Sequence, residues 1–537
     1  MRSAIEFIDM DREELNQLVE RARASLSVEE YRKLKGVVEA LSYLTDLVAD
    51  QETTIYDLRQ LLFPASTEKT EAVLKKAGME GTAKAAADPS GTSQAGEQKK
   101  NAPGHGRNGA EAYRNPRRVM VSHESLKHGD RCPGCRKGKV YEQPEPRRLV
   151  RIVGQAPLTA TLYELQRLRC NLCGEVYSAE APEGIGEDKY DESAAAMIAQ
   201  LKYGTGMPFY RLEDLEQNLG IPLPASTQWE IVEEAAELIK PARDELIRQA
   251  AQGEVLHNDD TSMKVLALRR AITEEAGERT GIFTSGVVST AEGRKIALFF
   301  TGRQHAGENL AEVLKWRAAE LPVPIQMSDA LSRNAPKPIQ LLVGNCLAHG
   351  RRQFVQITPN FPEPCRHVLE TLGEVYHQDR LAREHGLSGV ERLHFHQQHS
   401  QPVMNDLHQW LEAQLKENKV EPNSGLGKAI SYMLRHWQAL TLFLREPGAP
   451  LDNNLCERAL KKAILHRKNS LFYKTLNGAE VGDLYMSLIH TCELNGANAF
   501  DYLTKLQRHT EDLAAKPADW MPWNYRAALE RSLSNLS

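Results

Sequence analysis

The sequence predicts a multidomain α/β protein, and three observations carry this prediction. The chain has 537 residues, so we expect about three or four units of ~100–200 residues each. Between residues 251 and 478, short apolar runs that predict strands alternate with amphipathic stretches that predict helices. Upstream of them, a seven-residue apolar repeat and two Cys-x-x-Cys pairs indicate separate modules.

Composition limits the compartment and the partners. The formal net charge of −5 is mild, so any nucleic-acid surface must come from local basic clusters. Eight cysteines are too few for a disulfide scaffold of this length, which suits a reducing cytosol. The first residues lack a signal-peptide pattern and no 18 apolar residues run together, so we expect a cytoplasmic protein without membrane contact.

Residues 1–63 form the first predicted region, and their main signal is a heptad repeat within residues 31–62. Apolar residues recur at the a and d positions: Leu34, Leu41, Val48, Ile55 and Leu62, with Val37, Leu44 and Leu58. This pattern predicts a leucine-zipper coiled coil through which the chain forms a homodimer. The alternative is one amphipathic helix packed on its own core.

Residues 64–118 are expected to be a flexible linker. No Phe, Trp or Tyr occurs from Pro64 to Ala112, so this segment cannot bury enough apolar surface to offset its ordering entropy. Its far end is basic, with Lys99, Lys100, Arg107, Arg114, Arg117 and Arg118. These cations either contact DNA phosphates without reading sequence or are simply solvated.

Residues 119–186 are predicted to be a zinc module. Its four cysteines form two pairs, Cys132 with Cys135 and Cys170 with Cys173. Each Cys-x-x-Cys turn aims two thiolates at one ion, so two turns close a tetrahedral site with no open position, and one structural zinc is expected. The alternative is four buried free thiols. Between the pairs, two predicted strands with basic edges make DNA contact a further expectation.

Residues 187–250 have a helical pattern. A turn around Gly220 is followed by a second helix for which Ser226 or Thr227 is the expected cap, an arrangement compatible with helix-turn-helix DNA binding. However, that second helix carries Glu230, Glu233, Glu234 and Glu237, which would repel phosphate. We therefore favour a connecting helical domain over a recognition helix.

Residues 251–478 are expected to form the catalytic core. Strands are predicted at 254–258, 282–289, 295–301, 325–328 and 339–343, with a run at 263–268 and a helix at 308–320. Three strands joined by short turns, a helix and a fourth strand ending in an acid is the order of an RNase H-like fold. A histidine-rich helical insertion occupies about residues 355–450, and helices with Gly496 as a cap fill the C-terminal region, 479–537.

Three acids in this core are candidate metal ligands. Asp259 and Asp329 each end an apolar run, and Glu457 follows a helix start at which Asp452, Asn453 or Asn454 is available as N-cap. Together they could share one metal site, although Asp260 competes with Asp259. After Glu457 a basic run can hold a DNA backbone beside the acids: Lys461, Lys462, Arg467 and Lys468, with His466 between them.

The chain resembles the DDE transposases of the insertion sequence 66 family, specifically their large transposase subunit. The resemblance rests on the heptad helix, the Cys-x-x-Cys finger, the strand His257–Thr261, the block Asn345–Phe354, and the motif Asp452–Leu460 continuing to Arg467-Lys468-Asn469. It implies an RNase H-like DDE core with a helical insertion, in which Asp259, Asp329 and Glu457 bind two catalytic magnesium ions. Around Asp329 the family's usual Asp-Gly-Tyr is replaced by Asp-Ala-Leu.

The resemblance also implies partners. It makes the terminal inverted repeats and the target DNA the expected nucleic-acid partners, two small proteins of the same element the expected accessory factors, and the bacterial nucleoid the expected location. Arg351, Arg352 and Arg458 join the four basic residues named above as candidate DNA contacts.

Other histidines and cysteines in the core have competing interpretations. Cys346 and His349 are either metal ligands or a Cys–His nucleophile pair, but with Arg351 and Arg352 following we favour a helix that contacts DNA or packs on the core. His394, His396 and His399 are expected on the surface.

Two functions from different classes follow. The first is a magnesium-dependent enzyme that cleaves and joins DNA strands at the ends of an insertion sequence. The second is a non-catalytic zinc-finger DNA-binding regulator derived from a transposase. The presence of all three acids within their motifs favours the enzyme.

Overall fold

The computed structural model describes residues 189–536 except 275–278 and 338, and upstream of them 125–141, 156–169, 176–180 and the short pieces 20, 27, 29–35, 69–70, 73–74 and 182. The chain divides into two compact units, one of residues 84–352 and 374–537 and one of residues 1–83 and 353–373. Of the predicted coiled coil, only residues 31–35 are described, and they are helical. The remaining heptad positions and the basic linker lie outside the described residues.

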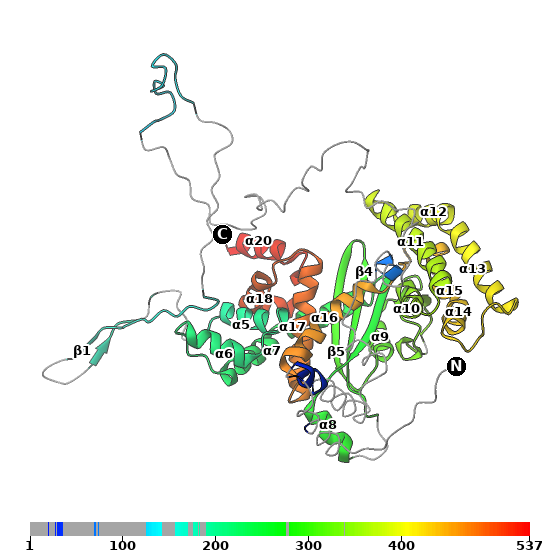
Figure 1. Ribbon diagram of the computed structural model, residues 1–537. Helices are drawn as coiled ribbons and strands as arrows, with labels where there is room; N and C mark the ends of the chain where they lie inside the picture. The colour runs from blue at the N-terminus through cyan, green and yellow to red at the C-terminus, as the bar shows by residue number, and fades with distance from the viewer. Residues whose placement is uncertain are drawn as a thin grey trace. The chain divides into compact units, whose positions relative to one another are not determined.

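A five-stranded mixed sheet forms the centre of the larger unit (Figure 1). Its strands are β3 (Val255–Ser262), β4 (Phe283–Ala291), β5 (Arg294–Gly302), β6 (Ile325–Ser328) and β7 (Leu342–Asn345). They lie in the order β5-β4-β3-β6-β7; β3, β4 and β5 are antiparallel neighbours, whereas β6 is parallel to β3 and β7 to β6. The α/β class predicted from the sequence is therefore observed.

The β4–β5 hairpin follows from its turn residues. Glu292 and Gly293 both have positive φ, 48° and 79°, and this pair of angles matches the two-residue turn that fits the twist of antiparallel strands. The interval 290–294 between the two predicted strands is thus shortened to a tight turn, because both strands extend into it.

Helix α17 (Leu476–Leu494) closes the free edge of the sheet. An edge strand presents unpaired N–H and C=O groups, and on β5 three of these N–H groups are bound by side chains spaced four residues apart on the helix. Thr301 N donates to Asp483 Oδ2 at 2.5 Å, Phe299 N to Ser487 Oγ at 3.0 Å and Ala297 N to Thr491 Oγ1 at 3.0 Å. Just beyond the helix, Asn495 binds both the N–H and the C=O of Lys295. The polar positions of α17 therefore replace a missing sixth strand.

Helix α16 (Asn454–Ser470) packs against β3 and β4 (Figure 1). Gly286, which pairs with Asp259 in the β3–β4 register, makes room for it: a Cβ at this glycine would lie 3.1 Å from Leu460 and 3.3 Å from the Cys456 sulfur. Because Cys456 and Leu460 are one turn apart, this contact fixes the rotation of the helix and the direction of its first turn.

The helices that precede and follow the sheet share one hydrophobic cluster, which extends from Ala196 to Ala528. The upstream helices are α5 (Glu192–Ala199), the π-helical turn η2 (Gln200–Gly204), α6 (Phe209–Asn218) and α7 (Ala225–Ala250); the downstream ones are α18 (Ala499–Arg508), α19 (Thr510–Ala515), η5 (Pro517–Trp520) and α20 (Tyr525–Leu536). Helix α7 contacts α17, and α18 contacts α5. The buried face of α7 thus packs into the hydrophobic core.

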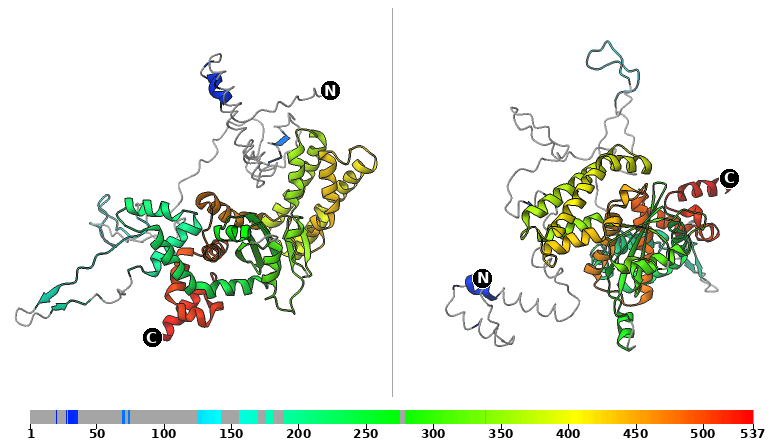
Figure 2. Two further views of the ribbon diagram at one scale, coloured as in Figure 1. Left: turned by 90° about the horizontal axis from the view of Figure 1, so that it is seen from below. Right: turned by 90° about the vertical axis from the view of Figure 1, so that its right-hand side faces the viewer.

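The insertion is helical, as predicted. It comprises α11 (Pro362–Glu384), α12 (Gly389–His399), α13 (Gln401–Lys416), α14 (Gly425–Arg435), α15 (Trp437–Leu440) and η4 (Leu442–Leu444). Helices α12, α13 and α14 pack in sequence order, as the yellow helices of Figure 2 show. Asp379 is bound by Arg392 Nη2 at 2.7 Å and approached by His396 Nε2 at 3.3 Å, so His396 is buried rather than at the surface as expected.

Several element boundaries differ from the predictions. Strand β3 continues through its polar end to Ser262, because Asp259, Asp260 and Thr261 pair with β4 despite the end of the apolar run. The run at 263–268 leads into helix α8 (Leu266–Glu274). Helix α9 (Ala306–Leu314) begins and ends earlier than expected, and α7 begins at Ala225 after Pro224, so neither Ser226 nor Thr227 is its cap. Gly496, with φ of 70°, follows the C-terminal cap of α17 as predicted.

Candidate functional site

Two of the candidate acids, Asp259 and Asp329, share one amide group. Asp259 lies in β3 and Asp329 directly follows β6, and the parallel register of these neighbouring strands brings the two side by side. Asn334 Nδ2 donates to Asp329 Oδ1 at 2.5 Å and lies 3.4 Å from Asp259 Oδ1. Asn334 belongs to the short 3-10 turn η3 (Ser332–Asn334), so this turn holds both carboxylates in place.

Glu457 reaches the same region from α16. It stands in the first turn of the helix, and its charge acts on Asp259 together with that of Asp329. Asn453, at the N-cap position, does not cap the helix with its side chain. Instead, its Nδ2 donates to the Asn258 carbonyl at 3.1 Å and its Oδ1 lies 3.1 Å from His257 Nδ1. This clamp joins the start of α16 to β3 beside Asp259.

A buried amide network lies behind the acids. Asn258 Nδ2 donates to the Asn334 carbonyl at 2.8 Å, and Gln326 Nε2 donates to Asn258 Oδ1 at 2.8 Å and to the Asn334 carbonyl at 2.6 Å. All three side chains are almost completely buried. Because buried amides are costly unless they are paired, the network fixes one arrangement of β3, β6 and η3.

Electrostatics at this site favour a bound cation. Burial, together with the neighbouring charges of Asp329, Asp260 and Glu457, raises the pKa of Asp259 to about 7, against a hydrogen bond from the Asp260 N–H that lowers it. Carboxylates gathered in a partly buried site repel one another, and a divalent cation relieves that repulsion. Glu457 Oε1 is a buried acceptor without a hydrogen-bond partner among the described residues, which also fits an ion.

Asp260 makes different contacts. Its Oδ2 lies 2.9 Å from His305 Nδ1 and its Oδ1 3.3 Å from Arg333 Nη2, and the side chain is only 1% exposed. The Asp260 carboxylate is therefore paired with an imidazole and a guanidinium of the protein, in contrast to that of Asp259.

Cys346 and His349 also lie beside Glu457. Cys346 follows β7 and His349 is in the first turn of α10 (Leu347–Ile357). The Asn453 N–H donates to Cys346 Sγ at 3.2 Å, and His349 Nδ1 is 3.7 Å from Glu457 Oε1. Burial raises the pKa of the Cys346 thiol to about 12. A Cys–His nucleophile pair is not favoured by this environment, because a nucleophilic cysteine needs a lowered pKa.

The candidate DNA-binding cations fall into two groups. Arg458, Lys461 and Lys468 are exposed, and their spacing along α16 places them on one stripe that begins next to Glu457. Lys462, by contrast, binds Glu493 at 2.7 Å and the Gly204 carbonyl at 3.0 Å. Arg467 binds Thr261 Oγ1 at 3.2 Å, so it supports the end of β3. Arg351 and Arg352 are half-buried on α10.

The structure describes one of the two Cys-x-x-Cys pairs of the predicted zinc module, Cys132 with Cys135. Cys132 N donates to the Gly138 carbonyl at 2.8 Å and Gly138 N to Cys135 Sγ at 3.4 Å, which closes a tight turn with Arg136 at φ 58°. Backbone N–H groups of Gly138 and Lys137 lower the pKa of Cys135, so this turn is suited to a thiolate. Cys170 and Cys173 lie outside the described residues; the antiparallel strands β1 (Arg167–Arg169) and β2 (Val176–Ser178) flank them in sequence.

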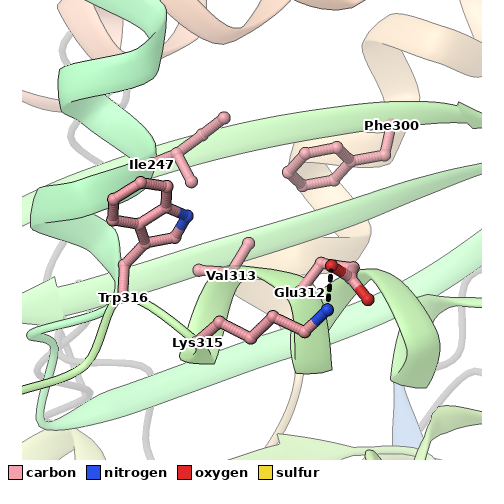
Figure 3. A pocket seen from close by; sticks show the side chains of 6 residues that line it. All are labelled: Ile247, Phe300, Glu312, Val313, Lys315 and Trp316. Atoms are coloured by element: carbon pink, nitrogen blue, oxygen red, sulfur yellow. Dashed lines mark hydrogen bonds and ion pairs between the residues drawn. The ribbon is translucent and has the colours of Figure 1, made fainter.

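A separate pocket of about 420 Å³ is lined by residues of α7, β5 and the end of α9, and none of the three candidate acids is among them (Figure 3). It is lined by Ile247, Phe300, Glu312, Val313, Lys315 and Trp316. Figure 3 shows its polar groups paired with each other, with Lys315 Nζ 2.6 Å from Glu312 Oε2. An apolar lining with one internally satisfied ion pair offers no catalytic group.

Sequence reasoning missed the roles of four residues of the site, of which it had considered Asn453 only as a helix cap: Asn258, Gln326, Asn334 and Asn453. Asn and Gln are common in turns and on surfaces, so a single sequence gives little reason to bury them. A weak signal was present, because Asn258 and Gln326 stand inside strand-forming runs that end in the acids.

Comparison with known proteins identifies one family and three similar proteins. The sequence profile described as "Transposase IS66 family" matches residues 189–481, a range that includes all three candidate acids. Three uncharacterized proteins of Sinorhizobium fredii (strain NBRC 101917 / NGR234) are also similar. The protein y4jD is 27% identical over 373 residues, 67% of this chain and 71% of that protein. The protein y4hP is 25% identical over 377 residues, 68% and 67%, and y4qI is 24% identical over 343 residues, 62% of each. Within the described part of the chain, no helix combines the length and apolarity that crossing a membrane requires.

Proposed function

The chain belongs to the IS66 family of transposases, and we propose that it catalyses divalent-metal-dependent DNA cleavage and strand transfer at the ends of an insertion sequence. One observation carries this proposal: three acids from separate segments come close enough to interact electrostatically, namely Asp259, Asp329 and Glu457. The charges of Asp329 and Glu457 raise the pKa of Asp259, and the two aspartates share the Asn334 amide. Segments so far apart in sequence have no structural need to gather like charges, so their meeting supports a shared ligand.

The strand order supports an RNase H-like core. Three antiparallel strands followed by two parallel ones, with the first strand in the middle, is the order expected for that fold. The first acid then lies on the central strand, the second at the end of the neighbouring parallel strand, and the third on a helix after the insertion. This arrangement is the basis for treating the acids as a DDE set.

Asp259, Asp329 and Glu457 are the residues that would hold two magnesium ions. Bound there, the ions would neutralise the reacting phosphate and activate the attacking hydroxyl. Asn334 keeps the two aspartates adjacent, and the Asn453 clamp keeps Glu457 at the same end of β3. No side chain is required to form a covalent bond to DNA, because water and then a 3′-hydroxyl serve as nucleophiles.

DNA is proposed to lie along the exposed stripe of α16. Arg458, Lys461 and Lys468 present three positive charges in line, starting one residue after Glu457. Phosphate contacts of this kind position a duplex without reading its sequence. Recognition of the terminal repeats is assigned to the zinc module with Cys132, Cys135, Cys170 and Cys173, and pairing of two ends to a homodimer through residues 31–62, with two small proteins of the same element as accessory partners.

The test of the function uses the DNA that flanks the gene. A duplex carrying the terminal inverted repeats found there is incubated with the full chain, with and without magnesium. We expect strand cleavage at the repeat ends only with magnesium. Specific binding without cleavage, in magnesium or in manganese, would refute the enzyme and support the non-catalytic zinc-finger regulator.

A further inference from the structure

A thiol, an imidazole and a carboxylate converge next to the acids. The ligand atoms of Cys346, His349 and Glu457 all lie within 4.8 Å of one another. The cluster therefore offers a metal ion one sulfur, one nitrogen and one oxygen ligand. Cys346 and His349 are three residues apart at the start of α10, a spacing that places both on one side of a helix. Glu457 faces them from α16.

Two of these side chains, His349 and Glu457, have a ligand atom that makes no hydrogen bond to the described residues. His349 Nδ1 and Glu457 Oε1 are both buried atoms without a hydrogen-bond partner among the described residues, and at 3.7 Å from each other they are too far apart for a hydrogen bond. Two polar atoms left in this way are costly, and an ion between them would satisfy both. The two side chains as a whole are 24% and 27% exposed, so the cluster lies close to the protein surface.

We propose that Cys346, His349 and Glu457 form a binding site for a thiophilic transition-metal ion, of which zinc is the physiological example. Zinc binds thiolate at about 2.3 Å and imidazole at about 2.0–2.1 Å. Around one zinc ion the three ligand atoms would lie closer to each other than they do here, and they would have to approach each other by a few tenths of an ångström to about an ångström. Three protein ligands leave a fourth position for water. Magnesium prefers oxygen ligands and would not select this set.

Metal binding at this site displaces one proton. The Cys346 thiol releases its proton to solvent as the sulfur–metal bond forms, and His349 binds as the neutral imidazole. The Asn453 N–H, at 3.2 Å from the sulfur, stabilises the thiolate that results.

Glu457 connects this site with the proposed active centre. A zinc ion held by Cys346 and His349 draws the Glu457 carboxylate toward α10, and the carboxylate is then withdrawn from the magnesium ions. Zinc is therefore an inhibitor that competes for one of the three acids, a consequence that rests on the proposed function.

The binding itself is tested without any cleavage assay. The full chain, with its zinc module filled and excess metal removed, is titrated with Co²⁺, whose thiolate complexes give a charge-transfer absorption band. We expect a new thiolate band, which Co²⁺ bound by the carboxylates alone does not give. Cys346→Ser should lose the band and weaken binding at least about tenfold, since even changes outside the ligand shell cost 10–100-fold in metal affinity.

Matched variants make this result decisive. Cys365→Ser removes another buried thiol, which belongs to no such cluster among the described residues, and it should leave the band unchanged. His349→Gln should weaken Co²⁺ binding but keep the thiolate, and it answers the question if Cys346→Ser does not fold. An identical band in the parent, Cys346→Ser and His349→Gln would overturn the site.

The activity arm tests the inhibitory role. At fixed magnesium, added zinc should stop cleavage by the parent and by Cys365→Ser, whereas Cys346→Ser should resist zinc at least about tenfold better, when each protein is compared with its own cleavage rate without zinc. Equal zinc inhibition of parent and Cys346→Ser would refute the role. If no variant cleaves under any condition, the proposed function fails, and the Co²⁺ titration still decides the site.

Discussion

At the scale of single residues, the site depends on buried amides as much as on carboxylates. Asn453 is the clearest case, because the motif that contains it looks like a helix cap and its side chain serves a different purpose. It bonds the Asn258 carbonyl and His257, whose pKa burial lowers to about 4 and which is therefore a neutral donor. Its exposed neighbour Asn454 instead bonds Asp452 through its N–H and its side-chain amide.

Replacing Asn453 should therefore affect both stability and chemistry. Asn453→Ala leaves the Asn258 carbonyl and the His257 imidazole short of a partner, at about 1–3 kcal/mol for each buried group that stays unpaired. Cleavage should slow on the order of 10–100-fold, because Glu457 is no longer held against β3. Thermal unfolding and cleavage rates measure the two effects. Asn454→Ala is the control, and equal losses in the two variants would contradict the clamp.

Asp483 predicts a pH dependence of stability. Burial raises its pKa, Arg243 and the hydrogen bonds from Thr301 offset this only in part, and the resulting pKa is about 7. The unfolded chain has a pKa near 4 for this group. Between these values the folded state keeps a proton that the unfolded state has lost, so the contribution is complete below about pH 4 and is lost as the pH rises to and through about 7.

Asp483→Asn removes this dependence while keeping an acceptor for the Thr301 N–H. Relative to the parent, the variant should gain stability between pH 5 and pH 8, on the order of a few kcal/mol. Chemical denaturation at both pH values measures the difference. The exposed Asp214→Asn serves as control. A parent and an Asp483→Asn variant whose stabilities change in parallel would rule out the buried carboxyl as the cause.

At the scale of elements, the apolar periodicity of the sequence predicted those strands and helices whose positions depend on buried apolar residues. Strand β6 has the predicted bounds, and the insertion, α17 and α18 are helical as expected. The polar ends were not predictable in the same way. Strand β3 runs four residues beyond its apolar part because β4 supplies partners, and the turn η3 forms because Asp329 and Asn334 bond each other. Such pairings depend on residues distant in sequence, which a local pattern does not contain.

Helix α16 makes the element-scale prediction. If Arg458, Lys461 and Lys468 each contact one phosphate, replacing all three by Ala should reduce the slope of log affinity against log salt by about 3 and weaken binding to all sequences alike. Salt titrations with a nonspecific duplex measure this. Lys462→Ala is the matched control, since that cation is already paired with Glu493. An unchanged slope in the triple variant would place DNA elsewhere.

At the scale of the whole molecule, we propose that a DDE core is joined to a zinc module and a dimerisation helix. Purified protein should hold one zinc per chain that survives a brief chelator wash, and Cys132→Ser should lose it because the ion needs all four thiolates. Metal analysis decides this, with Cys492→Ser as a control for loss of a core thiol. An equal zinc content in the parent and in Cys132→Ser would contradict the prediction of a zinc module.

The most direct test of the central claim is cleavage of a terminal-repeat duplex by Glu457→Gln in magnesium. The amide preserves the shape of the side chain but loses the charge that holds a hard cation. We predict that cleavage is abolished while DNA affinity stays near that of the parent, and that Asp260→Asn, whose carboxylate is paired with His305 and Arg333, still cleaves under conditions where it is folded. Cleavage that survives Glu457→Gln, or that is lost equally in a folded Asp260→Asn, would contradict the assignment of the acids.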